Sequence, residues 1–116
     1  MLRDFFLGFI KIHIIHHAAK EQVYGLALIQ ELKRHGYDVS PGTIYPILRK
    51  LEQAGYLVRD ERTVDGKVRK YYSATEEGRC VLDEAREKIE ELVDEVLENN
   101  SPVSLWEIPD RERHNE

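Results

Sequence analysis

Apolar side chains recur at helical spacing in two segments of the first 36 residues. Across residues 2–19 nearly every side of the expected helix is apolar, because phenylalanine and isoleucine recur without a polar stripe. Such a helix has to be covered on more than one face, and a second copy of the chain is the simplest source of that cover. The stretch YGLALIQELKRHG then places apolar residues on adjoining stripes of a shorter helix that ends at Gly36.

The stretch VSPGTIYPILRKLEQAGYL predicts a helix over residues 41–54, since four apolar residues follow one another at positions i, i+3, i+4 and i+7. These residues are Ile44, Ile47, Leu48 and Leu51. Ser40 is a suitable N-cap residue, and Pro41 fits the first helical position because its missing N–H costs nothing there. Pro46 lies just beyond the free amides of the helix start and predicts an irregular or tightened first turn. Two short helices joined by a turn that contains glycine indicate a helix-turn-helix.

The next segment has the pattern of a β-hairpin. The runs YLVRDERTV and KVRKYYSA flank an Asp-Gly pair, which strongly favours a two-residue hairpin turn. Polar residues occur on both faces of the two strands, so we expect a mostly solvated ribbon, that is, a wing rather than a core sheet. Tyr71 and Tyr72 are adjacent in a strand and point to opposite faces, so one of them is expected to pack inward.

A long amphipathic helix is expected after the hairpin. Thr75, or else Ser73, is expected to cap it, and it continues to about residue 99. Its apolar residues step by three and four positions, which is the spacing of a coiled-coil seam, and nothing else in the chain is large enough to cover them. The seam consists of Leu82, Ala85, Ile89, Leu92 and Val96. The spacing therefore predicts self-association through this helix.

Taken as a whole, the pattern predicts a mainly α-helical chain with one small β-hairpin. Residues 1–74 are expected to form a winged helix-turn-helix domain that includes the N-terminal helix. Residues 75–99 are expected to form a C-terminal dimerisation helix, and residues 100–116 a partly disordered tail. The N-terminal and C-terminal helices are the expected dimerisation elements.

Charge is distributed unevenly along the 116 residues. The net charge of −5 disfavours nucleic acid, but the part up to Tyr72 carries 12 Lys/Arg against 8 Asp/Glu, whereas the part from Ser73 carries 5 against 14. Only the front part is therefore suited to contact a polyanion. The single cysteine excludes an intramolecular disulfide and fits a reducing cytoplasm, and no uncharged run reaches the roughly 18 residues of a membrane span. We expect a cytoplasmic protein without membrane contact.

The start of the helix at residues 41–54 has the features of an anion-binding site. Gly42 has no side chain to keep a phosphate from the backbone, where the first amides and the helix dipole favour negative charge. Thr43 and Tyr45 are expected to face outward, and Arg49 and Lys50 follow further along the helix. With a basic ribbon behind it, this arrangement indicates a winged helix whose second helix enters the major groove of DNA while the wing contacts phosphates.

Two combinations of residues are more specific than a generic helix-turn-helix: SPGTIYPIL followed by LEQAGYL, and RKYY followed by a threonine and a glycine. In these motifs and the flanking helices, over about residues 2–99, the chain resembles the PadR family of bacterial transcriptional regulators. The resemblance implies a homodimeric winged-helix repressor of a near-palindromic double-stranded DNA operator, with the first and last helices at the dimer interface. One departure is Ala74, where the family usually has leucine; this loosens local packing but leaves the DNA-facing residues unchanged.

Mapped onto this chain, the resemblance assigns DNA contacts to the recognition helix and the wing. With the helix start included, the expected DNA-binding residues are Ser40, Gly42, Thr43, Tyr45, Arg49, Lys50, Lys67, Arg69 and Lys70. Arg49 either reads guanine or holds a phosphate, and Tyr45 either contacts DNA or packs within the motif. Some members of the family that the chain resembles bind small aromatic effectors near the dimer interface, and others are not known to bind any. Phe5 and Phe9 are expected to join the seam in that interface, and the expected effector contacts are Phe5, Phe9, Ile89 and Trp106.

Two alternatives remain open at this point. His13, His16 and His17 share one flank of the first helix, which suggests a metal- or proton-responsive sensor; the zincin pattern needs glutamate where Ile14 stands, so no metal ligands are assigned. A winged helix that binds a protein instead of DNA is the other alternative, and the salt dependence of binding distinguishes it. No phosphate-binding glycine loop, metal-ligand motif or nucleophile elbow occurs, so we expect neither an enzyme nor a cofactor.

Overall fold

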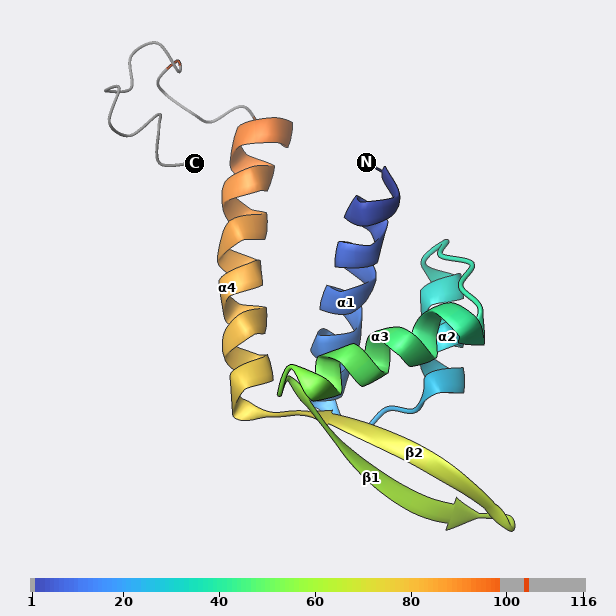
Figure 1. Cartoon of the computed structure of the whole chain (residues 1–116). Helices are drawn as coiled ribbons and strands as arrows, with labels where there is room; N and C mark the ends of the chain where they lie inside the picture. Colours follow the sequence, from blue (N-terminus) through green and yellow to red (C-terminus); the bar gives the residue numbers. More distant parts are fainter. Residues whose placement is uncertain (1, 99–103, 105–116) are drawn as a thin grey trace. The chain divides into compact units, whose positions relative to one another are not determined.

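The computed structural model describes residues 2–98 and residue 104 and has the predicted fold class, mainly helical with one antiparallel hairpin (Figure 1). The elements are α1 (Leu2–Lys20), α2 (Gly25–Arg34), α3 (Pro41–Gln53), β1 (Leu57–Val64), β2 (Lys67–Ala74), α4 (Glu76–Leu92) and a π-helical turn (Val93–Leu97). These residues fall into two compact units, one up to Ala85 and one from Arg86, so the boundary lies inside α4. No helix among the described residues is long and apolar enough to span a membrane.

The core of the first unit is formed where α1, α2 and α3 meet. Its four fully buried large side chains come from all three helices: Ile14, Leu32, Ile44 and Leu48. The apolar stripe predicted for residues 41–54 is buried at all four of its positions, because α3 turns this stripe toward α1 and α2. The polar side of α3 is left exposed to solvent.

The hairpin of β1 and β2 projects from the helices (Figure 1). Asp65 and Gly66 form its turn with φ values of 52° and 79°, the left-handed pair that a two-residue hairpin requires. Val64 pairs with Lys67 across the turn, and the register continues to the pair of Leu57 and Ala74. Most of the hairpin is exposed, as predicted, and Tyr72 is the tyrosine that packs inward.

The start of α3 differs in one respect from the prediction. Ser40 stands at the N-cap with an extended backbone, but its side chain makes no capping hydrogen bond; its Oγ lies 3.4 Å from Thr43 Oγ1 instead. The carbonyl of Ser40 accepts hydrogen bonds from the amides of both Thr43 and Ile44, each at 3.0 Å. This double acceptance is the tightened first turn that Pro46 predicted.

The start of α4 is fixed by Thr75 rather than by Ser73. Thr75 Oγ1 accepts a hydrogen bond of 3.0 Å from the Gly78 amide and donates one of 2.5 Å to the Gly55 carbonyl. One turn further on, Leu82 is only 3% exposed and belongs to the core of the first unit. The assignment of Leu82 to an open dimerisation seam therefore needs correction, since its side chain already packs within its own chain.

Gly78→Ala is expected to destabilise the chain by about 1–3 kcal/mol, because overpacking forces the backbone to shift. A β-carbon at Gly78 would lie 2.2 Å from the carbonyl oxygen of Tyr56, which is part of the backbone and cannot turn aside. Thermal unfolding measures the effect. Gly42→Ala is the matched control, because a β-carbon there meets only Ser40 Oγ, at 3.6 Å. Equal melting temperatures for the two variants would contradict the close contact.

Candidate nucleic-acid interface

The exposed side of α3 is the first component of the site. Successive residues of a helix are rotated by about 100°, so the side opposite the buried stripe is centred on Gly42, Arg49 and Gln53. Tyr45, with 43% of its surface exposed, lies on the flank that faces the hairpin. Lys50 is exposed on the other flank. Arg49 and Lys50 therefore have different surroundings, and Arg49 is the more central of the two.

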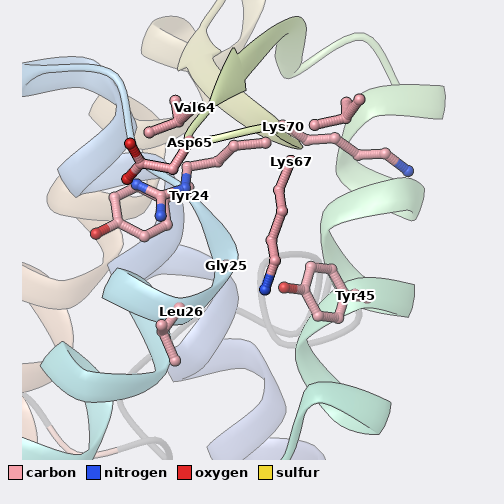
Figure 2. A pocket seen from close by; sticks show the side chains of 10 residues that line it. Tyr24, Gly25, Leu26, Tyr45, Val64, Asp65, Lys67 and Lys70 are labelled. Carbon is pink, nitrogen blue, oxygen red and sulfur yellow. The ribbon is translucent and has the colours of Figure 1, made fainter.

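A pocket of about 620 Å³ opens between the N-terminus of α2, Tyr45 and the outer part of the hairpin (Figure 2). Lys67 points from the hairpin toward the hydroxyl of Tyr45 (Figure 2). The residues that line this pocket are Tyr24, Gly25, Leu26, Tyr45, Val64, Asp65, Lys67, Val68, Arg69 and Lys70. Tyr45 and the wing lysines, which the sequence placed on separate elements, are thus brought to one place.

The N-terminal end of α2 adds positive potential to this pocket. Its N-cap residue, Tyr24, makes no side-chain capping bond, and its first turn contains no acidic residue. Gly25 is buried beneath the ring of Tyr45, where a β-carbon would lie 2.6 Å from the nearest ring atom. The aromatic ring therefore packs directly on the helix end, and the partial positive charge of the first amides lies beside Lys67.

A second pocket, of about 690 Å³, lies on the other side of Tyr45, between α3 and the hairpin. Its lining residues are Tyr45, Arg49, Glu52, Gln53, Arg59, Lys70 and Tyr72. Arg59 lies 3.5 Å from Glu52 and 3.4 Å from Glu61 in ion pairs. Among the described residues, Arg49 and Lys70 have no such partner and are available to an external anion. Burial raises the pKa of Tyr72 at the floor of the pocket.

Of the other predicted DNA-binding residues, Arg69 lines the first pocket, whereas Ser40, Gly42 and Thr43 lie outside both pockets. The guanidinium of Arg69 lies over the ring of Tyr24, 4.3 Å from its centre, and a hydrogen bond to the Tyr71 side chain raises the pKa of Arg69. Thr43 is half-buried and lines a different pocket, of about 530 Å³, with residues of α1 and of the turn before α3. Ser40 and Gly42 are exposed at the helix start.

Sequence reasoning missed two residues that help to build the site. The sequence pattern places Tyr24 on an apolar stripe, and nothing in its spacing indicates the contact with Arg69. The same pattern predicts a solvated strand position for Arg59, although the register of the hairpin helps to locate it. Counting outward from the Asp-Gly turn pairs Arg59 with Tyr72, the tyrosine that packs inward, and so places it on the face toward α3.

The residues predicted for dimerisation and effector binding belong to both compact units. In α1 the rings of Phe5 and Phe9 meet edge to face with centres 4.6 Å apart, and Phe5 is exposed. Beyond Ala85, the seam residues Ile89, Leu92 and Val96 are exposed. Trp106 lies outside the described residues.

The histidines of α1 gather around a carboxylate of α2. Glu31 lies 3.7 Å from His17 and 3.1 Å from His35, and the ring of His35 lies 5.1 Å from that of His13. The hydrogen bond from Arg34, 2.6 Å long, is the main cause that lowers the pKa of Glu31 to about 2. Within the part of the chain that the structure describes, no group of His, Cys, Asp and Glu side chains is arranged to hold a metal ion.

The comparisons with known proteins agree with this arrangement. The model of the "Transcriptional regulator PadR-like family" matches residues 14–84. The transcriptional regulator Rv3488 of Mycobacterium tuberculosis is 51% identical over 100 residues, which are 86% of this chain and 94% of that protein. A PadR family regulator of Eggerthella lenta superposes with a TM-score of 0.74 at 31% identity, covering 89% of this chain and 91% of that one. A Streptococcus transcriptional regulator gives a TM-score of 0.71 at 30% identity, covering 81% and 94%.

Proposed function

Because the chain belongs to the PadR-like family of transcriptional regulators, and is thus a DNA-binding regulator rather than an enzyme, we propose that it acts as a homodimeric repressor. Each α3 enters a major groove, and each hairpin lies along the phosphate backbone. The observation that carries the proposal is the position of Arg49. It lies at the centre of the exposed side of α3 and lines the same pocket as Lys70 of the hairpin.

The first pocket, which lies between Tyr45, the N-terminus of α2 and Lys67, is the proposed binding place for one backbone phosphate. The uncapped N-terminus of α2 and the amine of Lys67 both favour an anion there. The Tyr45 hydroxyl is a further donor at the edge of the same pocket. A phosphate contact of this kind fixes the register of the protein on DNA without reading sequence.

Dimerisation is proposed through the apolar surfaces that each unit leaves uncovered. In α1, Leu2, Phe5 and Phe6 are exposed, and beyond Ala85 the exposed seam residues continue the apolar pattern of α4. A dimer related by a two-fold axis presents two recognition helices about 34 Å apart, which matches successive major grooves of a near-palindromic operator. The expected partners are therefore a second copy of the chain and a double-stranded operator.

An aromatic effector is proposed to act at the dimer interface, near Phe5 and Phe9. The edge-to-face pair of these rings offers a surface on which a planar aromatic compound can pack. Trp106 is the single tryptophan of the chain, so its fluorescence is a specific probe. Titration with a planar aromatic dye is expected to change this fluorescence and to weaken operator binding; a dye that binds without affecting DNA affinity would argue against an effector role.

Selection of bound sequences from a random pool of DNA duplexes tests the proposal. A two-fold symmetric motif is the expected result, since the two identical recognition helices of a dimer select matching half-sites. Affinity for that motif is expected to fall steeply with added salt, because phosphate contacts release counterions. If the selected pool shows no motif and affinity does not depend on salt, a winged helix that binds a protein replaces this proposal.

A proton-responsive role is a second candidate, because the structure adds His35 to the histidines that the sequence placed together. His13 and His17 of α1 face Glu31, His35 and Tyr37. His16 and Lys20 lie near His17 on α1, and Arg34 pairs with Glu31. Protonation of His13 and His17 adds two positive charges near a single carboxylate, that of Glu31. Since His35 lies between α2 and the recognition helix, repulsion here acts on the turn that orients α3.

Lowering the pH from about 7.5 to 5.5 is expected to reduce the stability of the folded chain. Burial is the main cause that lowers the pKa of His13 and of His17 below 6.5, so the unfolded chain binds more protons. Their contribution is complete above pH 6.5 and is lost as the pH falls through that value toward the lower folded pKa values. Glu31 behaves likewise but loses its contribution only below pH 4.5, toward about 2.

Thermal unfolding at the two pH values measures this effect. The double variant His13→Gln and His17→Gln is expected to lose less stability on acidification than the parent chain. His114→Gln is the control, because His114 is the fifth histidine of the chain and lies outside the described residues. A parent chain that is equally stable at both pH values would remove the proton-responsive candidate.

A further inference from the structure

On one face of the hairpin, two arginines and one tyrosine form a stack with Tyr24, the N-cap residue of α2. The guanidinium carbon of Arg62 lies 4.7 Å from the ring centre of Tyr71, and that of Arg69 lies 4.3 Å from the ring centre of Tyr24. The two tyrosine rings meet edge to face with their centres 5.6 Å apart. Arg62 and Arg69 are direct cross-strand partners, and like charges in that position destabilise a hairpin. The aromatic rings offset part of this repulsion, since each accepts one cation on its face, and Asp60 pairs with Arg62 at 3.0 Å as well.

Residues of the stack are bonded to the segment of chain that precedes α2. Tyr24 is the N-cap residue of α2, and the side-chain oxygen of Gln22 accepts a hydrogen bond from Arg62. Between them, Val23 exchanges two backbone hydrogen bonds with Tyr72, of 2.9 Å and 2.7 Å. Side chains and backbone therefore both join the base of the hairpin to the helix-turn-helix.

The angle of the hairpin at this base decides where its lysines lie. Lys67 is five residues from Tyr72 along β2, a distance of roughly 17 Å at about 3.3 Å per residue. A rotation of about 10° at the base therefore moves Lys67 by about 3 Å, which is enough to break a contact with a phosphate. The backbone bridge at Val23 fixes one point only, so a second point of attachment is needed to set the angle.

We infer that Tyr24 and Tyr71 are positioning residues for DNA binding, which hold the hairpin at the angle where Lys67 meets the phosphate backbone. The inference rests on the proposed function, because it concerns how the hairpin serves DNA affinity. The inference also changes the role of Arg69, which the sequence predicted to contact DNA. Its guanidinium holds the hairpin on Tyr24, and the phosphate contact falls to Lys67 and Lys70.

The test compares affinity for one selected duplex over a series of potassium chloride concentrations, with the full chain. Tyr24→Leu and Tyr71→Leu are expected to weaken binding about tenfold, because a loosened hairpin has to be ordered when it binds. The slope of log affinity against log salt is expected to stay unchanged, since the same cations reach the phosphates. Lys67→Ala is the comparison, and its slope is expected to be shallower by about 0.9.

Two further variants sharpen the comparison. Arg69→Gln is expected to behave like the leucine variants, with weaker binding and an unchanged slope. Tyr71→Phe removes the hydroxyl that is hydrogen-bonded with Arg69 but keeps the ring beneath Arg62, and it is expected to retain most of the affinity because the ring contacts remain. The inference is overturned if the leucine variants bind as the parent does, or if Arg69→Gln lowers the slope as much as Lys67→Ala.

Amide hydrogen exchange of the DNA-free chain separates this inference from the proposed function. Tyr24→Leu is expected to accelerate exchange across residues 60–71, while the buried part of α3 keeps its protection. If the parent chain binds no DNA, the proposed function fails and the role of Tyr24 and Tyr71 in DNA affinity fails with it; the exchange result then still shows whether these tyrosines hold the hairpin in place. Unchanged exchange in the hairpin overturns it. If Tyr24→Leu loses protection throughout, Tyr24→Ile and the Tyr71→Leu variant provide the same comparison.

Discussion

Replacing Arg49 with alanine is expected to weaken binding to the selected operator by about 10- to 100-fold. Arg49 lies at the centre of the exposed side of α3, and none of the described residues forms an ion pair with it. A bidentate contact from an arginine to guanine is worth about 1–3 kcal/mol of discrimination between bases. Fluorescence anisotropy with a labelled operator measures the loss, and a scrambled duplex of the same composition measures how much of it depends on sequence.

Lys50→Ala is the matched control for Arg49→Ala, because it removes one neighbouring cation from the same helix. Lys50 lies on the flank away from the hairpin, so its loss is expected to weaken binding only a few-fold and equally for both duplexes. Arg49→Ala is expected to affect the operator far more than the scrambled duplex. Identical losses for the two variants on both duplexes would show that Arg49 holds a phosphate and reads no base.

Leu92→Glu is expected to produce a monomer and to lower operator affinity by about 100-fold or more, because each half-site is then bound by a separate molecule. In the unit beyond Ala85, Leu92 and Val96 are 53% and 66% exposed, although leucine and valine normally lie inside. A carboxylate in this seam cannot be buried against a second copy without a large cost in desolvation. Light scattering after size-exclusion chromatography measures the mass of the particle.

Lys88→Gln is the control for this substitution, since it changes the net charge by the same single unit on the same helix. Lys88 lies off the seam and pairs with Glu91 at 3.3 Å, an exposed contact of little energetic weight. This variant is expected to remain dimeric and to bind the operator with parental affinity. A Leu92→Glu chain that keeps the dimer mass would place the interface on another surface.

Local patterns predicted the elements that position the site. Asp65 and Gly66 adopt the left-handed conformations that only a few residue types accept readily, so the hairpin turn was predicted correctly at those two positions. The four apolar residues of α3 are buried because a helix gives them one common face. Pro41 and Pro46 likewise have effects that act within one turn of helix. In each case the cause lies within a few positions of its effect.

Contacts between distant segments could not be predicted in this way. Leu82 has the spacing of a seam residue, yet it packs in the core, because spacing does not tell which surface a helical stripe meets. His35 joins His13 only because α1 and α2 cross, and Arg69 meets Tyr24 only because the hairpin folds back onto the residues before α2. Ser40 has a side chain suited to capping, but in the fold its hydroxyl lies beside that of Thr43.

The paired hydrogen bonds between Val23 and Tyr72 have a consequence for biosynthesis. They join residues about 50 positions apart, so they cannot form until the ribosome has released the second strand, and contacts of such long range form slowly. Until then a nascent chain contains α2 and α3 without the hydrogen bonds between Val23 and Tyr72. Premature termination before Tyr72 therefore yields fragments that lack the complete winged helix-turn-helix, and they are expected not to compete with the intact regulator for DNA.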